Sequence, residues 1–424
     1  MRMPSRGRTA AVLLPAALIA AGLQLGVTPP AGHASSGPSA GELRLARGAE
    51  VAVPDGWIVV LKEPAKAAAA AAAAVPDVAR ELVGRAEGAR LGHVYRAALH
   101  GFSARMSRAQ AARTAADPRV AYIRQDTRVS VVDTAVDTTA GDTTQPNAPW
   151  GLDRIDQRRL PLSTTYTYRT TAPDVSVYVI DTGLRTTHKE FGGRASVGTD
   201  TVGDGRNGED CNGHGTQVGG IAAGTTYGVA KKAKVVAVRV LDCQGSGTAS
   251  GVIAGVDWVT AKAARPAVAN MSLGGTASEA IDTAVRNSIR SGVTYTVAAG
   301  SEGQAGGACG TSPSRVPETI SVGASDRGDR RAGSSNYGDC VSLFAPGVQI
   351  PSAWIGSDTA TATLSGTSMA TAHAAGAAAL HLGFRPADTP AQVKRGLVDN
   401  ATTGVLQGTP PVVPDRLLYT LYLP

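Results

Sequence analysis

The sequence predicts an α/β fold in which a parallel sheet carries helices on both faces, preceded by a small α+β domain. In the larger domain, uncharged β-branched runs at 175–180, 235–241 and 293–298 alternate with helical periodicity at 251–263 and 278–291. Because parallel neighbours need a crossover between them, this alternation is typical of a doubly wound sheet. The smaller domain is predicted from a regular order of short elements that ends near residue 126.

Five short elements predict the first domain. Two helices alternate with three stretches of strand, and in chain order these elements fall at 57–61, 75–90, 94–106, 107–116 and 120–123. Polyalanine at 67–74 favours a helix but does not point to a function. Residues 35–55 are rich in Gly, Ala and Ser and are expected to be a poorly ordered lead-in.

Residues 1–34 have the layout of a secretory signal peptide. Arg2, Arg6 and Arg8 precede an apolar run at 10–23, and small residues follow it. The apolar run is too short to favour a retained transmembrane anchor. We therefore expect a secreted, extracellular protein with no membrane association after processing.

The distribution of charge argues against a nucleic-acid-binding protein. The chain carries 41 Lys and Arg against 34 Asp and Glu, a net charge of +7. Residues 1–142 hold 17 basic and 12 acidic residues, which leaves 24 and 22 for the rest. The positive excess therefore lies mainly in segments expected to be removed, and no basic face with interleaved aromatic residues remains.

Ser368 lies in a run of small residues that leads into an Ala- and Leu-rich segment ending at Leu382. That segment reads as a buried helix, so Ser368 is expected near its N-terminus, where unpaired backbone N–H groups favour negative charge. Such a position suits a nucleophile. Gly-Thr-Ser is equally typical of an ordinary helix cap, so this segment alone leaves both interpretations open.

Two other segments provide partners for a nucleophilic serine. Asp181 follows the buried strand predicted at 175–180, at the edge of the sheet where sites assemble. His214 lies between two glycines where a loop becomes a helix. An isolated Asp or His is more often structural than catalytic, but these two residues and Ser368 follow the chain order of the subtilisin triad.

Dispersed motifs resemble the subtilase family. Three surround the candidate triad: residues 178–191 read YVIDTGLRTTHKEF, 212–216 read NGHGT and 365–371 read SGTSMAT. Three more resemble the aqualysin-like secreted bacterial enzymes of the proteinase K branch, namely WGLDRIDQ at 150–157, AVANMSLGG at 267–275 and SSNYG at 334–338. The resemblance covers about 145–422 and implies a subtilisin-like fold.

The resemblance implies a secreted serine endopeptidase that works through an acyl-enzyme. Ser368 would be the nucleophile, His214 the general base and Asp181 the carboxylate that orients it. Two glycine-rich loops would pair with an extended substrate, and small residues would form a first specificity pocket with little charge selectivity. These positions are Ser272, Leu273, Gly274, Gly245, Ser246, Gly247, Ala298, Ala299 and Gly300.

The sequence departs from the family pattern close to the candidate triad. Ser301 stands where the family has an asparagine whose amide donates to the oxyanion, and a hydroxyl is a shorter donor. Gln217 replaces a His and Ala372 a Pro, both outside the triad. A slowed protease and a pseudoprotease that binds peptides or inhibitors both remain open. A serine esterase of the α/β-hydrolase fold is disfavoured, because that fold needs the order Ser, Asp, His.

The resemblance also makes 56–126 a propeptide domain of ferredoxin-like α+β fold that blocks the protease until removed. Its most recognisable piece is LHGFSA at 99–104. Residues 127–142 are expected to form an exposed linker that is cut near 142–144, and 143–424 the peptidase domain. We expect a monomer whose partners are polypeptide substrates and its own propeptide.

All four cysteines lie in the second domain. In an exported chain an even number suggests disulfides, and four cysteines allow three pairings. No Cys-x-x-Cys spacing supports zinc. The family resemblance implies the pairs Cys211–Cys243 and Cys309–Cys340.

No cofactor is expected for the chemistry, but family members hold structural calcium with carboxylates. Asp153, Asp156 and Gln157 are retained at such a site, whereas Arg159 and Ser342 stand at two acidic positions. An arginine opposes a cation directly, so that site is expected to be lost or rearranged. Another candidate, for which a solvated loop is the simpler interpretation, is the acidic cluster Asp200, Asp204, Glu209 and Asp210.

Overall fold

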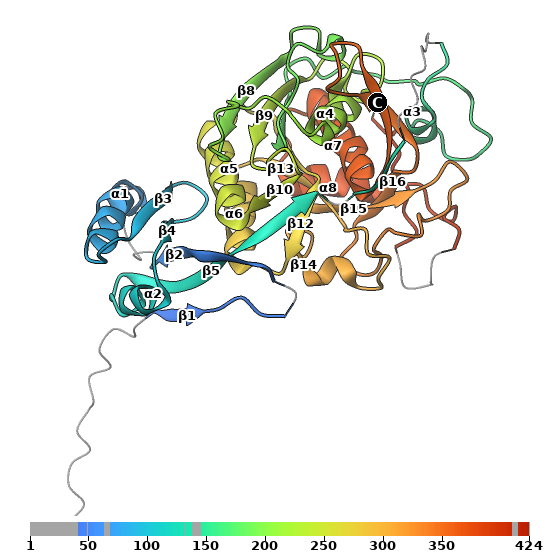
Figure 1. Cartoon of the computed structure of the whole chain (residues 1–424). Coiled ribbons are helices and arrows are strands. Elements are labelled where there is room, and N and C mark those ends of the chain that lie inside the picture. The colour runs from blue at the N-terminus through green and yellow to red at the C-terminus, as the bar shows by residue number, and fades with distance from the viewer. Residues whose placement is uncertain are drawn as a thin grey trace, which may run out of the picture. The chain divides into compact units, whose positions relative to one another are not determined.

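The computed structural model describes residues 41–48, 50–62, 68–131, 133–137, 146–408 and 414–423 (Figure 1). The predicted signal peptide at 1–34 lies outside these residues, as do the first part of the lead-in and the cut expected near 142–144. Within the described residues, no helix is long and apolar enough to cross a membrane.

A seven-stranded parallel sheet forms the centre of the larger domain. Its order is β16-β15-β13-β11-β7-β9-β8, and each neighbouring pair is parallel. The strands are β7 (Ser176–Asp181), β8 (Ala195–Asp200), β9 (Lys234–Arg239), β11 (Ala267–Met271), β13 (Thr294–Ala298), β15 (Ile320–Ser325) and β16 (Leu343–Pro346). The chain proceeds from β7 to one side and later to the other, so the order reverses at β7. In such sheets ligands bind beyond the carboxyl ends of the strands at the reversal.

Helices cover both faces of this sheet, which confirms the predicted fold class (Figure 1). Alternate residues of β7 point to opposite faces. Val177 and Val179 pack in a core cluster with residues of α4 and α7, whereas Tyr178 and Ile180 pack in a cluster with residues of α5 and α6. The helices are α3 (Trp150–Ile155), α4 (His214–Ala223), α5 (Ala249–Lys262), α6 (Glu279–Arg290), α7 (Thr367–Phe384) and α8 (Pro390–Asp399), with 3-10 turns η1 (Lys189–Phe191) and η2 (Gly307–Gly310).

The first domain is an antiparallel sheet, ordered β3-β4-β2-β5, with two helices. Its elements are β1 (Glu42–Arg44), β2 (Ala52–Leu61), α1 (Ala68–Gly84), β3 (Arg90–Tyr95), β4 (Gly101–Arg105), α2 (Arg108–Ala115) and β5 (Val120–Val131). Trp57, Phe102 and Ile123 are buried in its core. α1 begins earlier than predicted, inside the polyalanine, because alanine has the highest helix propensity.

The lead-in expected at 35–55 is partly ordered. β1 pairs in parallel with β5, and the Gly41 N–H donates to the Ala115 carbonyl at 2.7 Å. Arg44 also forms an ion pair with Glu279 of the larger domain. These partners are distant in the sequence, so the local Gly, Ala and Ser composition could not predict the pairing.

β5 belongs to two sheets, and this changes the boundary expected at residue 126. Its earlier residues pair with β2, and residues 128–131 pair antiparallel with β10 (Ser246–Thr248) and β12 (Leu273–Thr276) of the larger domain. A second strand, β6 (Asp133–Asp137), pairs antiparallel with β18 (Thr361–Gly366). Residues 128–131 and 133–137, expected in an exposed linker, are therefore strand, because the larger domain supplies their partners.

Two disulfides, Cys211–Cys243 and Cys309–Cys340, lie in the larger domain. This is the pairing that the family resemblance implies, out of the three that the sequence allows. Two further short strands, β14 (Thr311–Ser312) and β17 (Ile350–Ala353), pair antiparallel with β12 and β18.

Candidate active site

Asp181, the last residue of β7, and His214, the first residue of α4, meet at the edge where the sheet order reverses. His214 Nδ1 lies 2.7 Å from Asp181 Oδ1, and the Thr182 N–H donates to the same oxygen at 2.7 Å. Both side chains are buried. Burial raises the pKa of the Asp181 carboxyl, and the adjacent His214 opposes this shift. A proton on Nδ1 leaves Nε2 as the acceptor that a general base needs.

Glycines on both sides of His214 allow the close packing of this region. Gly213, which precedes α4, has φ of 109°, and a Cβ there would lie 2.5 Å from the Trp354 ring. A Cβ at Gly215 would lie 2.2 Å from the Gly183 carbonyl. A larger residue would therefore clash with Trp354 at position 213 and with the backbone that follows β7 at position 215, which explains the glycines of the NGHGT motif.

Ser368 is the second residue of α7, a helix that is buried along nearly its whole length. Its Oγ donates to the Ser272 carbonyl at 3.2 Å, and Ser272 Oγ donates to the Ser368 carbonyl at 2.9 Å. Asn270 Nδ2 in turn donates to Ser272 Oγ at 2.9 Å. The AVANMSLGG motif thus contacts the candidate nucleophile directly, and α7 packs against α4, which carries His214.

The two predicted substrate loops lie on either side of residues 128–131. Ser130 pairs with Gly274 on one side and with Ser246 on the other. The Val131 N–H donates to the Gly245 carbonyl at 3.0 Å. A segment of the chain itself therefore lies as an extended strand in the cleft between β10 and β12, where the sequence analysis expects a substrate to pair.

A cavity of about 610 Å³ lies beside this strand and includes Ala298, Gly300 and Ser301 in its lining. Ala299, which was predicted to line it, instead packs in a core cluster with Ala308 and Phe344, because side chains alternate along the strand direction. Among the described lining residues, the one titratable side chain is Glu302. Sequence reasoning missed this carboxylate because it lies just beyond the small residues that mark the pocket.

The loop that carries Ser301 is held by Asn336 of the SSNYG motif. Asn336 Nδ2 donates to the Ala299 carbonyl at 3.0 Å and to Glu302, and its Oδ1 accepts from the Gln304 N–H at 2.9 Å. Ser301 Oγ lies 3.3 Å from Thr367 Oγ1. Because Thr367 immediately precedes Ser368, this contact brings the substituted residue next to the start of α7.

The candidate calcium residues lie around one loop. Asp153 accepts from the Ser163 N–H at 3.0 Å and from the Thr164 N–H at 2.7 Å, and Gln157 Oε1 accepts from the Ser163 N–H at 3.1 Å. Within the described part of the chain, no group of three or more His, Cys, Asp or Glu residues is arranged to hold a metal. The candidate ligand atoms near Asp156 are all oxygens, which is the type of ligand that calcium binds. Only two of them belong to carboxylates.

The acidic loop is exposed at 203–207 and at Glu209, as expected for a solvated loop, and an arginine organises two of its carboxylates. Arg239 is fully buried, and its guanidinium donates to Asp200 at 2.9 Å and to Asp204 at 2.6 and 2.8 Å. The hydrogen bond to Arg239 lowers the pKa of Asp204 to about 2. The Arg239 guanidinium thus binds the carboxylates that a calcium ion would need as ligands. Asp210 is not among them, because its side chain faces α4.

Asp156→Asn is expected to raise the melting temperature at pH 8 in chelator and to have little effect at pH 4. Burial, and to a smaller extent the charge of Asp153, raises the pKa of Asp156 to about 6. Its stabilising contribution is therefore complete below the pKa of an unfolded Asp, about 3.9, and is lost as pH rises through about 6. Asparagine removes the buried charge and keeps an oxygen for the Thr167 N–H.

The matched control is Asp174→Asn, which changes an exposed aspartate. Melting curves with added calcium test metal binding separately. If the Asp156 carboxylate is a calcium ligand, calcium should raise the melting temperature of the wild type more than that of Asp156→Asn. If calcium shifts neither protein, these residues hold no calcium. If Asp156→Asn lowers the melting temperature at pH 8 in chelator, the role assigned to burial is wrong.

The fold and the site define a class of protein: a buried Asp–His pair, a serine at a helix N-terminus and a blocking strand are the parts of a serine protease with its propeptide. A model described as "Subtilase family" matches residues 172–413, and one described as "Peptidase inhibitor I9" matches residues 57–131. The chain belongs to the subtilase family and is a subtilisin-like serine protease with an I9 propeptide.

Named relatives agree with this assignment. An "Extracellular serine proteinase" of Thermus sp. (strain Rt41A) is 52% identical over 334 residues, 79% of this chain and 78% of the relative. "Alkaline serine exoprotease A" of Vibrio alginolyticus is 45% identical over 375 residues, 88% of this chain and 68% of the relative. The crystal structure of a cold adapted subtilisin-like serine proteinase superposes with a TM-score of 0.63 at 51% identity, covering 65% of this chain and 99% of that one.

Proposed function

We propose that this protease is a secreted, monomeric endopeptidase that cuts its own precursor and then hydrolyses polypeptides by a Ser368–His214–Asp181 triad. The observation that carries the proposal is the strand at 128–131, which lies in the cleft as a substrate would, with Ser368 beside Ser272, the residue that precedes β12. The name of the Thermus relative, an extracellular enzyme, supports export.

In the proposed mechanism, Ser368 Oγ attacks the peptide carbonyl while His214 Nε2 takes its proton and later gives it to the leaving amine. Asp181 keeps Nδ1 protonated and stabilises the imidazolium. The carbonyl oxygen becomes negative in the tetrahedral intermediate. The Ser368 N–H at the start of α7 is one donor for it, aided by the helix dipole, and the Ser301 hydroxyl is the second.

Covalent labelling tests this function. A fluorophosphonate probe reacts with an activated serine, so the matured wild type should be labelled and Ser368→Ala should not. A matched control, Ser365→Ala, removes another hydroxyl from the same segment and should keep the label. No labelling of the matured wild type would contradict the proposal.

A pseudoprotease that binds peptides is the second candidate, and the observation that favours it is Ser301. A hydroxyl at this position is a weaker oxyanion donor than an amide of the same loop would be. Such a protein would bind peptides in the cleft between β10 and β12 without labelling by the probe, so the same experiment separates the two functions.

The first cut in the precursor is predicted between Val131 and Asp133, about ten residues before the position expected from the sequence. Val131 pairs with Leu273 on one side of the cleft, and Asp133 pairs with Gly366, two residues before Ser368, on the other. The two paired segments therefore end on either side of the candidate nucleophile, which is the reason for placing the cut there. Mass spectrometry of the released propeptide should show a C-terminus at residue 131 or 132.

The propeptide reports this first cut even if the new N-terminus of the protease is trimmed afterwards. A propeptide that ends near 142–144 would show that the paired strand is not the cut segment. Val131→Pro provides a second measurement, because proline cannot donate to the Gly245 carbonyl and should slow the cut.

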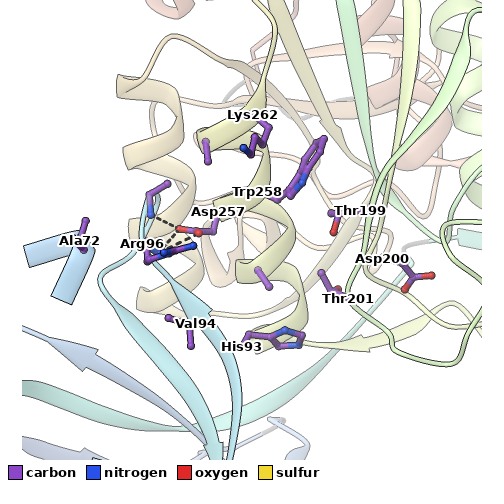
Figure 2. Close-up of a pocket in the computed structure, with 14 residues that line it drawn as sticks. Ala72, His93, Val94, Arg96, Thr199, Asp200, Thr201, Asp257, Trp258 and Lys262 are labelled. Atoms are coloured by element: carbon purple, nitrogen blue, oxygen red, sulfur yellow. Dashed lines mark hydrogen bonds between the residues drawn. The ribbon is translucent and has the colours of Figure 1, made fainter. Parts of the chain in front are cut away.

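Asp257 of α5 holds the propeptide by accepting three successive backbone N–H groups (Figure 2). Its Oδ1 lies 3.1 Å from Arg96 N, 2.6 Å from Ala97 N and 2.7 Å from Ala98 N. This contact lies on the outer face of α5, whereas the strand at 128–131 lies in the cleft. The propeptide is thus held on α5 as well as in the cleft.

Asp257→Asn is expected to weaken inhibition of the mature enzyme by its released propeptide by roughly 10–100-fold, because hydrogen bonds to a charged group contribute about 1.5–3 kcal/mol. Turnover of a short peptide should not change, since Asp257 is outside the cleft. The control is Lys262→Ala, which removes a charge from the same helix but forms none of these hydrogen bonds. Equal inhibition constants for the three proteins would contradict the role of Asp257.

A further inference from the structure

Asp210 lies behind the candidate Asp–His pair and accepts five hydrogen bonds. Its Oδ1 accepts from Thr182 Oγ1 at 2.9 Å, the Asn212 N–H at 3.0 Å and the Gly213 N–H at 2.9 Å. Its Oδ2 accepts from the Thr216 N–H at 2.8 Å and from Thr216 Oγ1 at 2.7 Å. The side chain is 5% exposed, so these groups replace water as its partners.

Thr182 connects this carboxylate to both members of the pair. Its N–H donates to Asp181 Oδ1, while its Oγ1 donates to Asp210 and accepts from the Gly215 N–H at 2.9 Å. The hydroxyl is thus used as donor and acceptor in a fully buried site. It links the end of β7 directly to the first turn of α4.

We propose that Asp210 and Thr182 are positioning residues that fix the His214 imidazole against Asp181. Asp181 and His214 come from different elements, 33 residues apart, and one hydrogen bond between side chains would leave the ring free to turn. The Asp210–Thr182 contact holds the residue after Asp181, the residue before His214 and the residues after it in one network. This inference rests on the proposed triad.

The negative charge of Asp210 is part of the argument. All five partners are donors, and three of them are N–H groups at the start of α4, where the helix dipole favours an anion. Asparagine is almost the same size, but its NH₂ group would face a donor at one of the two oxygens. Loss of charge and loss of one acceptor therefore disturb the network without creating a cavity.

The test compares Thr182→Val, which removes the hydroxyl at nearly constant volume, with Thr182→Ser, which keeps it. Val is expected to lower kcat by about 100-fold, because small displacements of catalytic groups cost rates of that order. KM should hardly change, and the acid limb of kcat/KM against pH should shift, because that limb reports the protonation of the general base. Thr182→Ser should restore kcat and the position of the acid limb. Asp210→Asn should behave as Thr182→Val does.

A second readout does not depend on activity. In the full-length Ser368→Ala precursor, the proton between His214 Nδ1 and Asp181 should give a far-downfield NMR signal, and Thr182→Val should broaden or shift it while the melting temperature shows a folded protein. An unchanged signal and an unchanged pH profile in folded Thr182→Val would overturn the inference. If the wild type is not labelled by fluorophosphonate but this signal responds as expected, the proposed function fails and the positioning role stands.

Discussion

Ser368→Ala is expected to leave the precursor uncut and to lower the rate of self-cleavage by about a million-fold. The magnitude is that found for subtilisin, where loss of the serine or of the histidine costs about 2 × 10⁶ in kcat. Here the proposed nucleophile lies on α7 and the proposed base on α4, and the strand at 128–131 pairs with β10 and β12. Mass spectrometry of the purified precursor over days gives the measurement.

His214→Ala should cause a loss of the same size, and the double variant should lose no more than either single one, because the residues act as a unit. The control Ser365→Ala should be cut at the normal rate. Additive losses, or a cut in the Ser368→Ala precursor incubated without active enzyme, would show that the triad is assigned to the wrong residues.

Ser301→Asn is expected to raise kcat, by up to about 10²–10³, with little change in KM. The range is the loss measured when the equivalent kind of donor is removed from subtilisin, so it sets an upper limit for the gain. A donor that acts only on the oxyanion changes kcat and leaves ground-state binding alone. Steady-state kinetics on a short peptide that lacks the propeptide contacts gives both constants.

Ser301→Ala decides whether the present hydroxyl donates at all. If it does, alanine lowers kcat further, because it removes the hydroxyl from a residue that lines the cavity. Equal kcat in all three proteins would remove residue 301 from the mechanism. If neither the wild type nor Ser301→Asn cleaves peptides or the propeptide, the binding function is the correct one.

The sequence predicted the parallel sheet well, because its strands carry a local signal. β7 is uncharged up to Asp181 and rich in β-branched residues, and both of its faces are buried, so it appears as a nearly continuous apolar run. The lead-in and linker were predicted less well. β1 and β6 have no such pattern, and each is a strand because a distant segment, β5 or β18, offers its edge.

At the site, motifs predicted residues whose backbone or chemistry is specific, such as His214 between two glycines. The partners that reach these residues from elsewhere were not predictable. Arg239 lies in an ordinary strand, yet it holds the acidic loop. Asp210 was interpreted as part of that loop, although its hydrogen bonds come from Thr182 and from residues at and just before the start of α4. The local sequence around a charged residue does not indicate the direction in which its side chain points.

Because β5 pairs both within the propeptide and with the larger domain, we expect the folding stability of the propeptide to determine when activity begins. The strand in the cleft and the strand that pairs with β2 are one continuous backbone, so a propeptide that leaves the cleft in its folded state keeps the segment that fits there. A released propeptide that unfolds no longer binds the protease, whereas one that stays folded rebinds and inhibits it. Residues such as Phe102 and Ile123 are buried in the core of the first domain. Their packing would then determine how long the propeptide inhibits the protease after the cut. We therefore expect the duration of inhibition to depend on a hydrophobic core in a different domain from Ser368.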